Sequence, residues 1–86
     1  MFTVLVCDDD KEIVNAIEIY LVQEGYRVLK AYDGIQAIEM LKKEEVHLLV
    51  IDVMMPRMDG IKMSCRLKEL FPNISIIFMS GYSDKE

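Results

Sequence analysis

The chain has little of several residue types that mark particular classes of protein. It contains one histidine, two cysteines and no tryptophan among 86 residues. Cys7 and Cys65 fall in a strand pattern and a helix pattern, without the spacing of a disulfide framework, so we expect reduced, packed thiols and a cytoplasmic location. His47 has no ligand-type residue three or four positions on. A structural or solvent-facing role is therefore expected for it, and not a metal site.

Positive charge and long apolar runs are also scarce. Ten lysines and arginines against fifteen acids give a formal net charge of −5, which argues against direct binding of nucleic acid or of an anionic membrane. The residues up to Cys7 are too few for a signal peptide, and no apolar stretch approaches membrane-spanning length. A chain of 86 residues predicts one domain over residues 1–86, with no room for a second.

Short apolar runs alternate with stretches of helical periodicity along the whole chain. The expected strands cover residues 3–7, 26–31, 46–51 and 74–79. The expected helices cover residues 11–24, 34–43 and from Asp59, as a cap, to about Leu70. Right-handed crossovers between such strands give an α/β fold, with a parallel sheet and helices on both of its faces.

The first expected helix has signals at both ends. Asp9, with Glu12 three residues on, resembles a capping box, and Gly25 is placed to end the helix. Asp10 is interpreted as a first-turn acid that the helix dipole stabilises. The apolar residues expected to face inward are Ile13, Val14, Ile17 and Leu21.

Polar side chains follow three of the four expected strands. The first strand ends in Asp8 and Asp9, the third in Asp52 and the fourth in Ser80, whereas the second runs into Ala31. If the strand order is 2-1-3-4, the three polar ends are neighbours, at the edge where open α/β sheets hold their functional crevice. Clustered carboxylates repel one another, and a hard divalent cation is the usual remedy.

The segment from Asp52 to Gly60, Asp-Val-Met-Met-Pro-Arg-Met-Asp-Gly, lies 43 residues downstream of Asp9. With the acidic pair at Asp8 and Asp9, it resembles the receiver domain of two-component response regulators. The resemblance covers all 86 residues and implies a flavodoxin-like sheet of order 2-1-3-4. It also implies a phosphorylation-dependent signalling switch, not an enzyme, in which Asp52 accepts a phosphoryl group from a sensor histidine kinase.

By position, the same resemblance assigns the metal site. It implies that Asp9 binds Mg²⁺ directly, that Asp8 acts mainly through a bound water, and that Asp52 and the main-chain carbonyl of Met54 are further ligands. Ser80 would supply the hydroxyl that contacts the phosphoryl group and helps to switch the domain. Oxygen ligands of this kind suit Mg²⁺, which stabilises the charge of a transferring phosphoryl group.

The chain departs from the family at its end. The family fold has five strands and five helices, so a partial receiver is expected, without the fifth strand, the last helices and the lysine that contacts the phosphoryl group. Lys85 follows the wrong strand for that role. The strand at 74–79 then becomes an open apolar edge, which predicts self-association. An output domain able to bind DNA would belong to a longer parent protein.

Two alternatives remain at this point. One is a receiver-like fragment that acts only through protein contacts and takes no phosphoryl group. The other is a phosphatase of the haloacid-dehalogenase type. The residues Asp8-x-Asp10 superficially resemble the nucleophile motif of that family. That family needs threonine or valine after the second aspartate, where this chain has Lys11.

Overall fold

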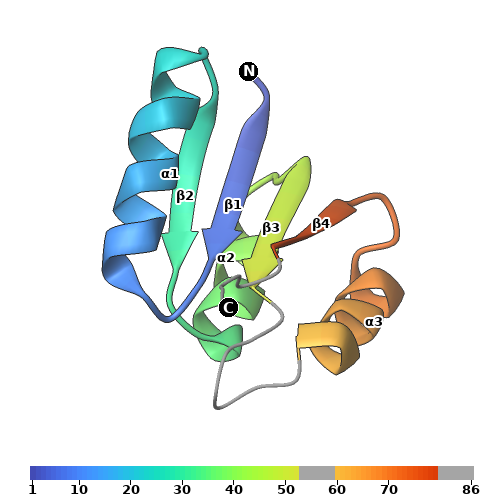
Figure 1. The fold of residues 1–86 in the computed structure, drawn as a ribbon. Coiled ribbons are helices and arrows are strands. Elements are labelled where there is room, and N and C mark those ends of the chain that lie inside the picture. Colours follow the sequence, from blue (N-terminus) through green and yellow to red (C-terminus); the bar gives the residue numbers. More distant parts are fainter. Residues whose placement is uncertain (53–59, 80–86) are drawn as a thin grey trace.

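The structure, a computed structural model, describes residues 1–52 and 60–79. These residues alternate strand and helix in the order that the sequence predicts (Figure 1). The elements are β1 (Thr3–Cys7), α1 (Lys11–Gln23), β2 (Arg27–Ala31), α2 (Gly34–Lys43), β3 (Leu48–Asp52), α3 (Gly60–Leu70) and β4 (Ser75–Met79).

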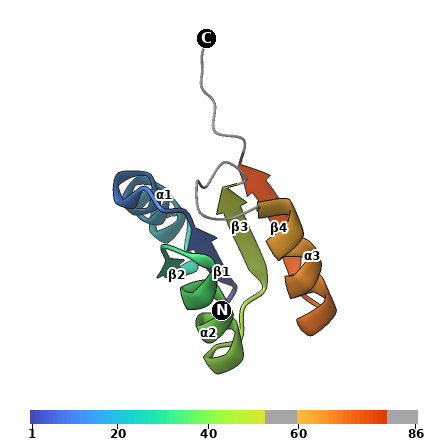
Figure 2. The same cartoon turned by 90° about the horizontal axis from the view of Figure 1, so that it is seen from below.

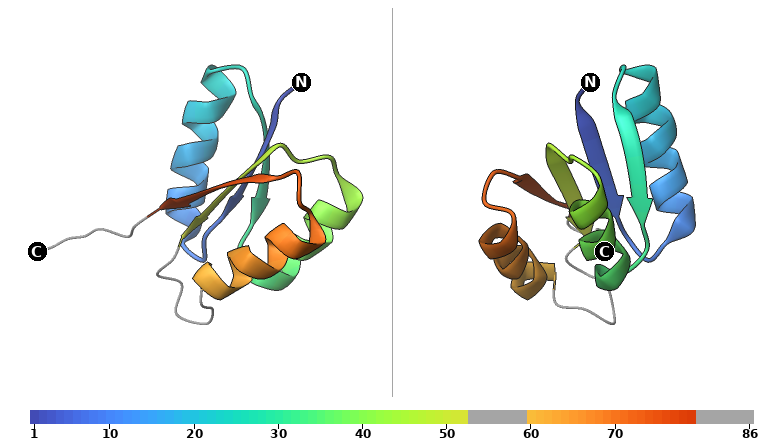
Figure 3. Two further views of the ribbon diagram at one scale, coloured as in Figure 1. Left: turned by 90° about the vertical axis from the view of Figure 1, so that its right-hand side faces the viewer. Right: turned by 180° about the vertical axis from the view of Figure 1, so that it is seen from behind.

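The strands pair as one parallel sheet in the order β2-β1-β3-β4, which confirms the predicted flavodoxin-like arrangement. At the carboxyl end of β1, Cys7 lies opposite Ala31 of β2 and opposite Ile51 of β3. The register therefore brings the residues that follow β1 beside the last residue of β3. Among the described strands β4 lies at one edge of the sheet, beside α3 (Figure 3).

Helices cover both faces of the sheet, with α1 on one face and α2 and α3 on the other (Figure 2). Alternate strand residues divide between these faces, as the two-residue period of a strand requires. The core under α2 and α3 is the larger one, and its fully buried strand residues are Leu5, Cys7, Ala31, Leu49 and Ile51. The core under α1 is smaller, with Val4, Val6 and Val14 buried.

The start of α1 differs from the sequence prediction. Asp10, not Asp9, is the N-cap, and its carboxylate accepts hydrogen bonds from the backbone N–H groups of Glu12 at 3.0 Å and Ile13 at 3.4 Å. The expected capping box of Asp9 and Glu12 was wrong. The reason is that Asp8 Oδ1 accepts the backbone N–H of Asp10 at 3.0 Å, which turns the chain so that Asp10 occupies the cap position.

The buried stripe of α1 is correspondingly narrower than expected. Val14 is fully buried, and Ile17 and Leu21 pack against it at partial exposure. Ile13, expected to face inward, is 43% exposed, because it lies about 100° around the helix from the fully buried Val14, at the margin of the apolar stripe.

Gly25 ends α1 as predicted. The backbone N–H of Tyr26 donates to Leu21 O at 3.1 Å and that of Gly25 donates to Val22 O at 3.0 Å, which is the Schellman pattern. Gly25 has φ of +93°, a conformation that residues with a Cβ rarely adopt.

The other helices follow their predicted bounds. Asp33 caps α2 by accepting the backbone N–H of Gln36 at 2.8 Å. Asp59, the expected cap of α3, lies outside the described residues. On α3 the side chain of Cys65 is exposed, so the prediction that it packs was wrong: the buried face of this helix carries Met63, Ser64 and Leu67 instead. None of the described helices is long and apolar enough to cross a membrane.

Candidate acidic site

Three carboxylates meet at the carboxyl edge of the two central strands. One oxygen atom from each of Asp8, Asp9 and Asp52 lies within 4.8 Å of the other two. Asp8 and Asp9 follow β1, and Asp52 is the last residue of β3, which pairs directly with β1. The cluster therefore results from strand order: two neighbouring parallel strands end in acids at the same edge.

The three carboxylates differ in depth. Asp8 is buried, with 1% of its surface exposed, Asp52 is half-buried and Asp9 is exposed. The backbone fixes Asp8 from two sides, because its N–H donates to Ala31 O at 3.2 Å while its Oδ1 accepts the N–H of Asp10 at 3.0 Å. The site thus has a closed inner end at Asp8 and an outer end that is open to a ligand at Asp9.

Burial and like charge act together on Asp8. Burial, the largest cause, and the neighbouring charges of Asp52 and Asp9 together raise the pKa of this carboxyl to about 6, against the lowering effect of the hydrogen bond from the Asp10 N–H. Near neutral pH a fraction of Asp8 therefore carries a proton. Any cation that binds between these carboxylates competes with that proton.

Cys7 immediately precedes the cluster but faces the opposite way, into the core under α2 and α3. Burial, with the charges of Asp33 and Asp8 next in size, raises the pKa of its thiol to about 12. Its Sγ lies 3.7 Å from Asp33 O. Cys7 is therefore a neutral packed thiol, as its place in the strand predicted, and not a thiolate ligand.

The donor set of the cluster fits a hard divalent cation. All three groups offer carboxylate oxygens, which Mg²⁺ and Ca²⁺ prefer to nitrogen or sulfur. Oxygens that share one Mg²⁺ lie about 3 to 4 Å apart, given metal–oxygen distances of about 2.1 Å. Carboxylate oxygens already within 4.8 Å of one another need only small side-chain rotations to reach that spacing.

Some residues assigned by sequence fall outside this geometry, and others were missed. Met54, Ser80 and Lys85 lie outside the described residues. The sequence interpretation missed the contact between Lys11 and Tyr32, in which Nζ lies 5.6 Å from the ring centroid. A signal for it existed, because Lys11 opens α1 and Tyr32 follows β2, so both belong to the same edge of the sheet.

Comparisons with known proteins agree with this architecture. A family model, the response regulator receiver domain, matches residues 4–86. Response regulator GtcR of Aneurinibacillus migulanus is 37% identical over 79 residues, which is 92% of this chain and 32% of that protein. Autoinducer 1 sensor kinase/phosphatase LuxN of Vibrio harveyi is 44% identical over 82 residues, 94% of this chain and 10% of that protein. The chain thus spans a third or less of these two relatives.

Solved structures show the same fold. Response regulator TrrA of Thermotoga maritima, solved in complex with Mg²⁺–BeF, superimposes with a TM-score of 0.88 at 26% identity, over 96% of this chain and 72% of that one. A two-component transcriptional regulator AraC of Clostridium phytofermentans gives a TM-score of 0.83 at 38% identity, over 99% of this chain and 71% of that one. With a family model over nearly its whole length and these relatives, the chain belongs to the response regulator receiver domain family.

Proposed function

We propose that this chain carries the phosphoacceptor site of a two-component signalling switch, with Asp52 as the residue that accepts the phosphoryl group. The observation that supports this most directly is the convergence of Asp8, Asp9 and Asp52 within 4.8 Å at the carboxyl edge of the sheet. A sensor histidine kinase would be the donor, and the cytoplasm the compartment in which the two meet.

Each carboxylate has a distinct part in this proposal. Asp52 is the nucleophile: one of its oxygens forms the new bond to phosphorus while the bond from phosphorus to the donor's histidine nitrogen breaks. That nitrogen then takes a proton from solvent. Asp8 and Asp9, on the neighbouring strand, would hold a divalent cation, Asp9 directly and Asp8 mainly through water. Bound there, Mg²⁺ would neutralise charge on the transferring group.

Met54 and Ser80 complete the proposed site. The main-chain carbonyl of Met54 would be a further metal ligand, and the Ser80 hydroxyl would contact the phosphoryl group. Both assignments rest on their position in the family's motif, because both residues lie outside the described part of the chain.

A small phosphodonor tests the proposal without a cognate kinase. The chain is incubated with acetyl phosphate and Mg²⁺, and intact mass is compared with a sample that contains a chelator. We expect an adduct of one phosphoryl group that needs Mg²⁺ and is absent in Asp52→Asn. Asp33→Asn is the matched control, because it removes a carboxylate near the same edge while Asn still caps α2. An adduct that persists in Asp52→Asn would contradict the assignment.

A second function has one observation in its favour. Within the described residues β4 is an edge strand, and its Ile77 and Phe78 are 52% and 46% exposed. An apolar strand with an unpaired edge is a template for pairing with another chain. A role through protein contacts alone, by self-association along β4, is therefore the alternative if no phosphoryl adduct forms on the folded chain.

The phosphatase alternative loses its main support. It needs Asp10 as an acid near the nucleophile, yet the Asp10 carboxylate accepts the N–H groups of Glu12 and Ile13 as a helix cap. The family match points the same way.

A further inference from the structure

The amino end of the sheet, opposite the acidic cluster, is joined through His47. The backbone N–H of His47 donates to Thr3 O at 2.9 Å, and its backbone oxygen accepts the N–H of Ser75 at 3.2 Å. In return the N–H of Thr3 donates to the imidazole Nδ1 of His47 at 2.9 Å. One residue thus links the first residues of β1, β3 and β4, and its side chain supplies an acceptor that the backbone ladder does not.

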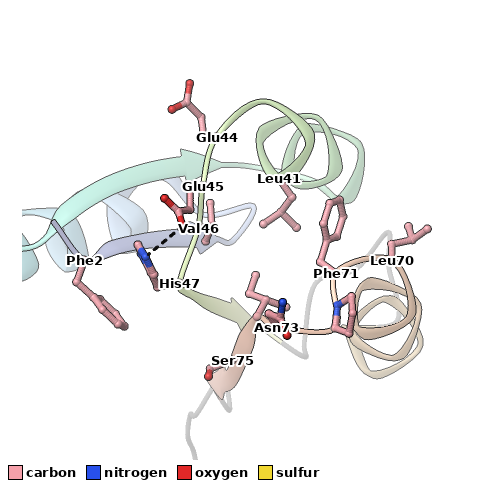
Figure 4. Close-up of a pocket in the computed structure, with 12 residues that line it drawn as sticks. Phe2, Leu41, Glu44, Glu45, Val46, His47, Leu70, Phe71, Asn73 and Ser75 are labelled. Atoms are coloured by element: carbon pink, nitrogen blue, oxygen red, sulfur yellow. Dashed lines mark ion pairs between the residues drawn. The ribbon is translucent and has the colours of Figure 1, made fainter.

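Aromatic stacking holds the imidazole in this place. The Phe2 ring lies 5.0 Å from it, nearly parallel at 21°, and Tyr26 meets Phe2 edge-on at 5.6 Å. The backbone N–H of Arg27 donates to Phe2 O at 3.0 Å, so the residue that stacks on His47 is itself tied to β2. Figure 4 shows Phe2 and His47 together at the side of a pocket of about 580 Å³.

The hydrogen bond from Thr3 depends on the protonation state of His47. A backbone N–H can only donate, so Nδ1 must be the unprotonated nitrogen of a neutral ring. Protonation places a second donor opposite the Thr3 N–H. Thr3 is 3% exposed, so water cannot readily replace the lost acceptor, and a buried N–H without a partner is costly.

We propose that His47 is a pH-sensitive clasp for the amino end of the sheet: the neutral imidazole holds the start of β1 through Thr3, and the imidazolium releases it. The chemistry is local. Release would free the Thr3 N–H from the imidazole, while the bond from the His47 backbone N–H to Thr3 O and the acid cluster at the far edge would stay in place.

The charged groups around the imidazole act mainly on its other nitrogen. Glu45 Oε2 lies 3.9 Å from Nε2, an ion pair only when His47 is protonated (Figure 4). This carboxylate lies beside Nε2 and cannot supply an acceptor for the Thr3 N–H, which faces Nδ1. Among the described residues, the other charged side chain that lines the adjoining pocket is Glu44, which pairs with Arg27 at 2.8 Å.

Amide hydrogen exchange measured by NMR tests the clasp. The protection factor of the Thr3 N–H, which corrects for the intrinsic effect of pH on exchange, is followed with the His47 ring signals from about pH 8 to 5. We expect the protection factor of the Thr3 N–H to fall by about tenfold or more, the effect of one lost hydrogen bond. The midpoint pH of this fall should equal that of the His47 ring titration. Val28 in β2 serves as an internal reference whose protection does not follow that midpoint.

Two variants separate His47 from the acids that titrate in the same range. His47→Asn keeps an acceptor near the position of Nδ1, and Thr3 should stay protected at every pH. His47→Gln carries its acceptor farther out, and Thr3 should be unprotected at every pH. Thr3 protection that is independent of pH in the natural chain, or that falls equally in His47→Asn, would overturn the proposal. So would a ring that takes no proton before the whole sheet unfolds.

Discussion

At the scale of single residues, Asp8 carries a conflict between burial and charge. Its carboxyl is 1% exposed, and burial is the main reason that its pKa rises from 3.8 to about 6. Between these two values the folded protein keeps a proton that the unfolded chain has lost. The contribution of Asp8 to the free energy of unfolding is therefore highest below pH 3.8, and it declines as the pH rises from there through about 6.

This linkage makes a prediction for the metal-free chain. From pH 4 to pH 7, Asp8 should lower the free energy of unfolding by on the order of 3 kcal/mol at most. Urea denaturation at several pH values, with a chelator present, measures how the free energy of unfolding changes with pH. Asp8→Asn removes the charge but can still accept the Asp10 N–H, so its stability should exceed that of the natural chain at pH 7. Equal pH slopes in the two proteins would contradict the assignment.

Single residues also show what sequence could not supply. The neighbouring places of Asp8, Asp9 and Asp52 followed from apolar runs that end in acids. The role of His47 did not, because its Nδ1 accepts from Thr3, 44 residues away in sequence. The exposure of Cys65 could likewise not be predicted from the sequence, since helical periodicity alone left open which side of α3 meets the sheet.

At the scale of secondary structure elements, the helix ends are set by local hydrogen bonds that sequence locates to within a residue. Gly25 ends α1 as predicted, and Asp33 caps α2. The cap of α1 is Asp10 and not the predicted Asp9, because Asp8 accepts the Asp10 N–H. That hydrogen bond forms only when β1 holds Asp8 in position. The element was predictable, and its first residue depended on the tertiary structure.

The cap assignment predicts a specific cost. Asp10→Ala leaves the backbone N–H groups of Glu12 and Ile13 without their acceptor and should lower the free energy of unfolding by about 1 kcal/mol. Asp10→Ser, which keeps a capping oxygen, should restore most of it. Chemical denaturation measures both variants. Phosphoryl uptake at Asp52 should survive in either one, since Asp10 takes no part in the proposed transfer; loss of uptake in the stable serine variant would contradict that.

At the scale of the whole molecule, the sheet is covered unevenly. Within the part of the chain that the structure describes, the core under α2 and α3 has ten buried hydrophobic residues, whereas the core under α1 has three, with Leu48 and Val50 only half-buried there. Among the described residues the β4 edge adds exposed apolar surface, including Ile77 and Phe78. Apolar area of this kind favours association over a monomer.

Self-association through β4 is therefore expected of this chain. Sedimentation velocity should show oligomers that grow with concentration, and Phe78→Lys should shift the distribution toward monomer, because a charge on an edge strand opposes pairing. Ile19→Lys is the matched control, since Ile19 is 61% exposed on α1, away from that edge. A monodisperse monomer at high concentration would count against this expectation.

The proposed phosphoacceptor site requires Asp8, Asp9 and Asp52 to act as one cation site. Isothermal titration calorimetry with Mg²⁺ at pH 6, in two buffers of different ionisation enthalpy, measures both binding and the protons released. Because the pKa of Asp8 is raised to about 6, binding should release about half a proton there and almost none at pH 8. Asp9→Ala should weaken binding, and Asp33→Asn should leave it unchanged. Absence of Mg²⁺ binding by the folded chain, or binding that Asp9→Ala leaves unaltered, would contradict a cation site at these acids.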